Sequence, residues 1–287
     1  MKRTEIHIRD PFVLVHEGKY YLYGTRGKTA WGMADGFDVY VSTDLAEWDG
    51  PYECFRNDGS FWADRNYWAP EVHYWQGGFY LFASFKNEVM CRGTAILRAD
   101  TPMGPFVPHS DGPVTPAEWE CLDGTFYVSH EGKPYMVFCH EWVQIGDGEV
   151  CAVELAQDLR KAVGKPRILF HATDAKWSRR VRHSSGMEGY VTDGPFLWRT
   201  QQGKLLCLWA SFSESGYTET IAVSDNGEID GQFTQADPLF EKDGGHGMVF
   251  RALDGQLYLT LHAPNRNPEE RPHFHPIEER DGMLVRL

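Results

Sequence analysis

The sequence predicts an all-β protein, a single five-bladed β-propeller domain that spans residues 1–287. One short motif returns five times, with 52 to 70 residues between corresponding positions. Short apolar runs typical of strands fill the rest of each repeat, and helical periodicity is almost absent. A repeat of this length made of short strands is the pattern of a propeller blade, which needs about four strands.

Each copy of the motif indicates a β-hairpin whose leading end carries a polar side chain. A polar or acidic residue stands beside Pro or Gly, and an apolar run, a Gly-containing turn and a second apolar run follow. The five copies cover residues 9–23, 68–82, 123–138, 193–209 and 245–259.

Further strands are predicted after the first four hairpins, at 37–42, 94–99, 150–155 and 220–224. Residues 153–163 alone have helical spacing. Because Asp158-Leu159 occupies the place of Asp44-Leu45 in the first repeat, we interpret this stretch as a strand end and a turn. No linker rich in Ser or Pro divides the chain, which favours one domain. We expect the N-terminal residues to pair into the last blade and close the ring.

The composition excludes some classes of partner. A net charge of −13 argues against nucleic acid and against an anionic membrane surface. No apolar stretch reaches the roughly 20 residues of a membrane span, and no apolar segment of a signal peptide follows the basic N-terminus. We therefore expect a cytoplasmic protein. The six cysteines lack metal-site spacing and are expected to be buried reduced thiols.

The leading residues of the five motif copies are the candidates for function. The first strand of each blade lines the central channel of a propeller, so these residues are expected to converge near the axis. They are Asp10, Glu71, Asp123, Asp193 and His246. A single Asp beside Pro or Gly is usually a turn residue. Four carboxylates in one pocket oppose one another's ionisation, a cost usually tolerated for chemistry or for a cation.

Two paired carboxylates with separated pKa values are what glycoside hydrolysis requires. Aromatic residues near the same face suit a sugar ring, and Trp31, Trp68 and Trp75 are candidates, although Trp75 fits core packing better. Arg251 is a candidate for contact with a substrate hydroxyl, with an ordinary surface ion as the alternative. The expected partner is an oligosaccharide. The oligomeric state has no signal in the sequence.

Five segments together, in this order, resemble glycoside hydrolase family 43. They are Arg9-Asp10-Pro11, Trp68-Ala69-Pro70-Glu71-Val72, the strand at Asp123, Asp193-Gly194-Pro195, and Gly244-Gly245-His246-Gly247 with Leu261-His262-Ala263-Pro264-Asn265. The resemblance covers essentially the whole chain. It implies a five-bladed propeller and hydrolysis with inversion, mostly of α-L-arabinofuranosides or β-D-xylosides, and with the convergent carboxylates we expect an exo-glycosidase that acts on plant-type oligosaccharides. β-D-galactofuranosides are the third substrate class it implies.

The resemblance also implies roles for single residues. Asp10 would be the general base, and Asp123 would orient the acid and tune its pKa. His246 corresponds to a histidine near a central cation, often Ca²⁺, held largely through water. Glu71, Trp31, Trp68 and Arg251 are the candidates for substrate binding.

The departure from the family pattern lies in the fourth repeat, where members typically have Glu-Gly-Pro and this chain has Asp193-Gly194-Pro195. Either Asp193 is the general acid in a tightened pocket, or Glu188 supplies the proton, or the protein is an inactive carbohydrate-binding propeller. Glu120-Cys121 is also similar to a motif of the retaining fructosidases. The Asn-Asp-Pro nucleophile motif of those enzymes is missing here, which disfavours that alternative.

Overall fold

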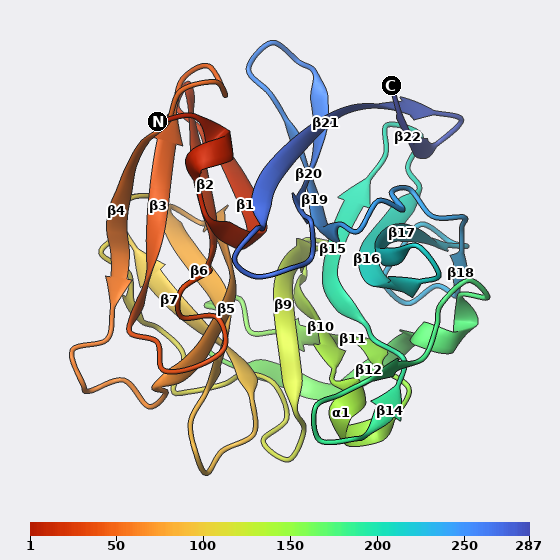
Figure 1. The fold of residues 1–287 in the computed structure, drawn as a ribbon, viewed down its shortest axis with the longest axis horizontal. Coiled ribbons are helices and arrows are strands. Elements are labelled where there is room, and N and C mark those ends of the chain that lie inside the picture. Colours follow the sequence, from red (N-terminus) through yellow and green to blue (C-terminus); the bar gives the residue numbers. More distant parts are fainter.

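The computed structural model describes residues 1–287 as five four-stranded antiparallel sheets set around a central axis (Figure 1). The prediction of a five-bladed propeller is confirmed. Blade 1 holds β1 (Ile8–His16), β2 (Lys19–Arg26), β3 (Gly36–Ser42) and β4 (Asp49–Arg56). Blade 2 holds β5 (Arg65–Trp75), β6 (Gly78–Lys86), β7 (Gly93–Ala99) and β8 (Val107–Pro108). Blade 3 holds β9 (Cys121–Val128), β10 (Pro134–His140), β11 (Glu149–Leu155) and β12 (Ala162–His171). Blade 4 holds β15 (Asp193–Arg199), β16 (Leu205–Ser213), β17 (Gly216–Ser224) and β18 (Phe233–Gln235). Blade 5 holds β19 (Gly245–Arg251), β20 (Leu257–Ala263), β21 (Arg271–Arg280) and β22 (Met283–Arg286).

A few short elements lie outside the sheets. They are the 3₁₀ turns η1 (Arg3–Glu5) and η2 (Ala172–Asp174), the helix α1 (Trp142–Ile145) and a small hairpin of β13 (Val181–Arg182) and β14 (Glu188–Gly189). No helix of the structure combines the length and the apolar character that crossing a membrane requires.

The stretch 153–163 forms no helix, as expected. β11 ends at Leu155 and a turn follows. Leu45 and Leu159 both adopt left-handed backbone angles, with φ of 64° and 59°. The two residues therefore occupy equivalent turns, which supports the alignment of the repeats.

The expected pairing of the N-terminus into the last blade is wrong. Every sheet is built from consecutive strands, and the outer place in blade 5 is taken by β22 from the C-terminal hairpin. Side chains hold the seam between blades 1 and 5 instead. Arg9 forms an ion pair of 2.6 Å with Glu270, and the Arg3 guanidinium lies 4.6 Å from the centroid of the Phe274 ring.

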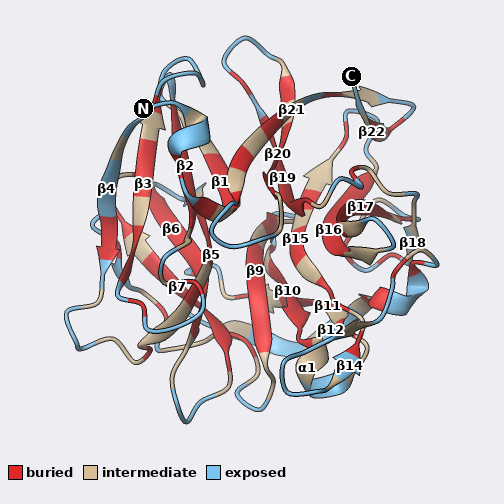
Figure 2. Ribbon diagram, viewed as in Figure 1, coloured by how far each residue is buried: buried red, intermediate tan, exposed pale blue.

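The apolar runs pack between neighbouring blades, which is why both faces of the inner strands are buried while β4 is largely exposed (Figure 2). The largest apolar cluster joins blades 1, 2 and 5, with Leu22, Phe85 and Phe250 among its members. Burying one such side chain contributes about 1.5–3 kcal/mol. All six cysteines are free, and all but Cys91 are buried. This packing fixes the positions of the five inner strands at the axis.

Candidate active site

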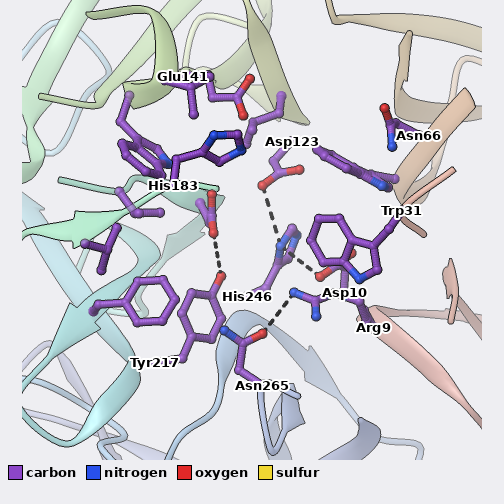
Figure 3. A pocket seen from close by; sticks show the side chains of 18 of the residues that line it. Arg9, Asp10, Trp31, Asn66, Asp123, Glu141, His183, Tyr217, His246 and Asn265 are labelled. Carbon is purple, nitrogen blue, oxygen red and sulfur yellow. Dashed lines mark hydrogen bonds and ion pairs between the residues drawn. The ribbon is translucent and has the colours of Figure 1, made fainter. Parts of the chain in front are cut away.

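A pocket of about 780 Å³ lies where the first strands of the blades meet (Figure 3). All five blades contribute to its wall. The residues from the first strands are Arg9, Asp10, Asn66, Trp68, Leu122, Asp123, Asp193 and His246. The residues from the surrounding loops and other elements include Trp31, Arg92, Glu141, Trp142, Arg182, His183, Tyr217, Asn265 and Asn267.

A backbone feature explains why these side chains converge. Every first strand has a residue in a left-handed conformation, with φ between 48° and 56°, at Asp10, Ala69, Asp123, Gly194 and His246, and β5 has a second one at Asn66 with φ of 50°. The strand pairing shifts at each of these places. Such a bulge interrupts the alternation of side chains along a strand. As a result, two successive residues, such as Arg9 and Asp10, line the pocket.

The bulges also correct the expectation that the leading residues of the five motif copies are equivalent. Ala69 and Gly194 occupy the bulge position in blades 2 and 4, so Glu71 and Asp193 are not equivalent to Asp10. Asp193 stands one residue before the bulge, as Arg9 does, and still lines the pocket. Glu71 stands two residues after the bulge and is buried outside the pocket lining, where its Oε2 accepts a hydrogen bond of 2.6 Å from Thr125.

The Asp10 carboxylate is held in its ionised form. Thr25 Oγ1 donates to Oδ2 of Asp10 at 2.6 Å. Burial alone would raise the pKa of Asp10, but the charges of His246 and Arg9 outweigh burial and lower it. Asp10 therefore stays an acceptor of protons over the ordinary pH range.

A chain of polar contacts fixes the position of Asp10. The backbone N–H of Asp10 donates to Nδ1 of His262 at 3.2 Å, and Nε2 of His262 lies 3.1 Å from Oδ1 of Asn265. Arg9 Nη2 donates to the same Asn265 oxygen at 2.9 Å. Burial and the nearby Arg9 lower the pKa of His262 to about 3, so this imidazole is neutral. A neutral imidazole can accept at Nδ1 and donate at Nε2, as these contacts require.

His246 lies between two carboxylates. Its Nδ1 is 3.3 Å from Oδ1 of Asp10 and 3.6 Å from Oδ2 of Asp123. Burial disfavours a charged imidazole, yet Asp10 and Asp123 outweigh burial and raise the pKa of His246. The imidazolium thus supplies positive charge between the two carboxylates.

A directly bound cation does not fit this cluster. No group of three or more His, Cys, Asp or Glu side chains in the chain is arranged to hold a metal ion. The Nδ1 atom of His246 is directed at the two carboxylates that would be the nearest ligands. The water-held Ca²⁺ expected from the sequence stays a prediction, and no chemical step below is routed through it.

Asp123 reaches the fourth blade through a backbone contact. Its Oδ2 accepts a hydrogen bond of 3.0 Å from the N–H of Gly194. Gly194 has φ of 52°, and a Cβ atom there would lie 2.7 Å from the His246 ring, so both the backbone and the packing require glycine. Asp123 thereby fixes the turn that carries Asp193.

Asp193 is held in its protonated form at moderately acid pH. Burial and the charge of Asp123 raise its pKa to about 7. Its Oδ2 accepts a hydrogen bond of 3.0 Å from the Tyr217 hydroxyl (Figure 3). One carboxyl of the pocket, Asp10, is therefore ionised while another, Asp193, carries a proton.

Of the other predicted residues, Trp31 and Trp68 line the pocket, whereas Arg251 and Trp75 do not. The ring centroids of Trp31 and Trp68 are 5.4 Å apart, and Trp31 is 63% exposed. Arg251 is exposed and donates to the Gly255 carbonyl outside the pocket. Trp75 lies outside the pocket lining and packs on Phe126 between blades 2 and 3, which agrees with the packing role preferred from the sequence.

Glu188 does not line the pocket. Its side chain is 50% exposed and lies 3.9 Å from Arg180. The neighbouring Gly189 explains this position, since a Cβ atom there would lie 2.2 Å from the carbonyl oxygen of Gly146, so that β14 packs closely on the end of α1. Glu120 of the fructosidase-like motif also lies outside the pocket lining, in a 2.6 Å ion pair with Lys86.

Sequence reasoning missed several pocket residues, and three of them make polar contacts that matter to the site. Arg92 forms a buried ion pair of 2.5 Å with Glu141, and its guanidinium lies 3.9 Å from the Trp68 ring centroid. Tyr217 comes from the third strand of blade 4. Glu141 follows directly after the end of β10, a polar residue at a strand end that could have been found. Arg92 and Tyr217 have no such signal, because only long-range packing brings them to the axis.

Comparison with known proteins gives a consistent result. A family model described as glycosyl hydrolases family 43 matches residues 4–284. The chain is similar to the crystal structure of an endo-arabinase from Bacteroides thetaiotaomicron VPI-5482, with 40% identity, a TM-score of 0.92 and coverage of 98% of each chain. It is 22% identical over 298 residues to the extracellular exo-α-(1→5)-L-arabinofuranosidase ArbA of Cellvibrio japonicus (strain Ueda107), covering 91% of this chain and 80% of that protein. It is 26% identical over 145 residues to a xylosidase/arabinosidase of Bacteroides ovatus, covering 44% of each.

Proposed function

The chain belongs to glycosyl hydrolase family 43, and from that membership we propose that its pocket releases arabinose from α-L-arabinofuranosidic chain ends. Members of this family are glycoside hydrolases that invert the anomeric configuration, and this chain is such an enzyme. The choice of sugar, the action at chain ends and the roles of single residues are the proposal.

The opposite protonation of Asp10 and Asp193 carries the proposal. Inversion needs one carboxylate that takes a proton from water and one carboxylic acid that gives a proton to the leaving oxygen. Asp10, with its lowered pKa, is the base. Asp193, with its pKa raised to about 7, is the acid. One bond forms between the water oxygen and the anomeric carbon as the bond to the leaving oxygen breaks.

Asp123 and His246 maintain this difference in protonation. The Asp123 carboxylate raises the pKa of Asp193 and holds the Gly194 turn. The His246 charge lowers the pKa of Asp10. Without His246 burial would be opposed less strongly at Asp10, and without Asp123 the pKa of Asp193 would be raised less, so the difference between the two carboxyls would narrow.

Two observations support an arabinofuranoside as the substrate. Three similar proteins, one of them 40% identical over 98% of this chain, are named for arabinan or arabinoside hydrolysis. The pocket also offers Trp31 and Trp68 as apolar surfaces beside amide and guanidinium donors, which suits a sugar ring with several hydroxyls. Action at chain ends is supported by the name of one relative, an exo-α-(1→5)-L-arabinofuranosidase, whereas the 40% identical structure is named an endo-arabinase.

A panel of 4-nitrophenyl glycosides tests the proposal. We expect the highest kcat/KM on the α-L-arabinofuranoside and lower values on the β-D-xyloside and the β-D-galactofuranoside. With linear arabino-oligosaccharides, arabinose should appear from the first time point. Release of nitrophenol from none of the three, together with no product from linear arabino-oligosaccharides, by a folded protein that binds sugar in calorimetry would instead favour an inactive carbohydrate-binding propeller.

A further inference from the structure

We infer that Tyr217 is a positioning residue for the proton donor. Its phenol holds Oδ2 of Asp193, so that Oδ1 carries the proton delivered to the leaving oxygen. This inference rests on the proposed function of the pocket. It adds a residue from outside the five motif strands and assigns the transferable proton to one oxygen.

The Asp193 carboxyl and the Tyr217 hydroxyl are paired exclusively. Tyr217 Oη donates to Asp193 Oδ2 at 3.0 Å, and this is the one hydrogen bond that the structure gives to either group. Oδ1 of Asp193 accepts no hydrogen bond from the protein, and both residues line the pocket. The orientation of the Asp193 carboxyl therefore depends on a single donor.

The packing around Tyr217 holds its ring in one place. The ring is 1% exposed, lies nearly parallel to the His262 ring at 5.5 Å and contacts Phe212 at 5.2 Å. Its backbone carbonyl accepts from the Gly244 N–H at 2.9 Å. A Cβ atom on Gly245 would lie 2.8 Å from the ring, so glycine at that position makes room for the phenol. A donor fixed in this way needs little reorganisation when the reaction proceeds.

The chemistry of a carboxylic acid then places the proton. In the protonated acid one oxygen accepts and the other donates. Because burial keeps the pKa of Tyr217 well above 10, the phenol remains a donor and Oδ2 remains the accepting oxygen. The acid proton consequently sits on Oδ1 and passes from there to the leaving oxygen. The same phenol then donates to the Asp193 carboxylate that remains, which favours the charge that develops during transfer.

Several groups act on Asp193 together. The titratable groups that face it from the packed strands are Asp10, Asp123, Cys139, Tyr217 and His246. Burial and Asp123 raise the pKa of Asp193, while His246 and the Tyr217 hydrogen bond lower it. Removing the phenol oxygen alone should therefore raise the pKa of Asp193 further.

The test is Tyr217→Phe, which keeps the ring and removes the donor. Kinetics on a 4-nitrophenyl and a 2,4-dinitrophenyl α-L-arabinofuranoside are compared with kinetics on arabinobiose. We expect kcat on arabinobiose to fall about 10–100-fold, the range for a lost hydrogen bond to a charged group. The dinitrophenyl glycoside should lose little, because its leaving group needs no proton. Tyr23→Phe is the matched control, since Tyr23 is also a buried phenol, donating to the Pro102 carbonyl.

A titration without turnover supplies the second measurement. Carbon-13 NMR of aspartate carboxyls, with Asp193 assigned by Asp193→Asn, should show a higher pKa for Asp193 in Tyr217→Phe and an unchanged one in Tyr23→Phe. Equal losses on all three glycosides, or an unshifted carboxyl titration, would overturn the inference while leaving the proposed function intact. Failure of the wild-type protein to cleave any glycoside would overturn the proposed function, and with it the proton transfer, whereas the titration would still report the pairing.

Discussion

Replacing Asp193 by Asn, with Glu188→Gln as the matched control, decides which carboxyl gives the proton. Asn has nearly the same shape as Asp, and its amide oxygen can still accept from the Tyr217 hydroxyl, so the fold of the pocket should persist. Only the transferable proton is lost. Glu188 is half-exposed and outside the pocket lining, so its amide variant should behave as the wild type does.

The size of the effect follows from the role of Asp193. General acid catalysis contributes about 10²–10⁴-fold, which corresponds to roughly 2.7–5.4 kcal/mol in the activation barrier at 1.36 kcal/mol per tenfold change. We expect Asp193→Asn to lose kcat/KM on 4-nitrophenyl α-L-arabinofuranoside within that range. The loss should be larger on arabino-oligosaccharides, whose leaving groups need a proton more.

The variant also has a predicted effect on stability. Because the pKa of Asp193 is raised on folding, the folded state binds more protons than the unfolded state between about pH 4 and 7. The free energy of unfolding therefore decreases as pH rises through that window, and Asp193→Asn should remove this part of the dependence. Urea unfolding at pH 5 and pH 8 measures it. Retained activity in Asp193→Asn together with a collapse in Glu188→Gln would refute our reasoning about the acid.

Three further predictions follow from the pocket. The kcat/KM of the wild type should fall as pH rises above about 7, because Asp193 then loses the proton it donates, and a profile that stays level to pH 9 would argue against this acid. Arg92→Ala should lower the free energy of unfolding by about 3–5 kcal/mol, because it leaves the buried Glu141 carboxylate without its partner. Urea denaturation measures this change, and a loss under about 1 kcal/mol would contradict the prediction. Trp31→Ala should raise KM with Tm unchanged, because the side chain is 63% exposed beside the pocket; an unchanged KM in steady-state kinetics would remove Trp31 from the substrate site.

The sequence revealed the blades and the meeting of their first strands, because the motif repeats a local backbone requirement. Each bulge needs a residue that tolerates a left-handed conformation, and Asp and Gly supply it in several copies. In blade 4 the bulge is at Gly194, one residue after Asp193, and in blade 2 it is at Ala69, two residues before Glu71. Only the pairing of the strands reveals these offsets. The prediction that the five leading residues occupy equivalent positions was therefore wrong for Glu71 and Asp193.

Other features depend on long-range packing and had no local signal. Tyr217 reaches Asp193 only because β17 lies against blade 5, where Gly245 makes room for its ring. Glu188 was a reasonable candidate by position, but the close approach of Gly189 to Gly146 fixes β14 so that Glu188 lies outside the pocket lining. The closure of the ring was mispredicted because the C-terminal hairpin already supplies the outer strand of blade 5.

The anomer released first tests the central claim most directly, since it reports the geometry of base, water and acid in one observation. Proton NMR of wild-type hydrolysis of an α-L-arabinofuranoside, recorded before mutarotation, should show β-L-arabinose as the initial product. That result is predicted by water activation at Asp10 opposite the proton donor Asp193. Initial release of α-L-arabinose would contradict the account, because retention requires a covalent intermediate that this assignment of the pocket does not contain.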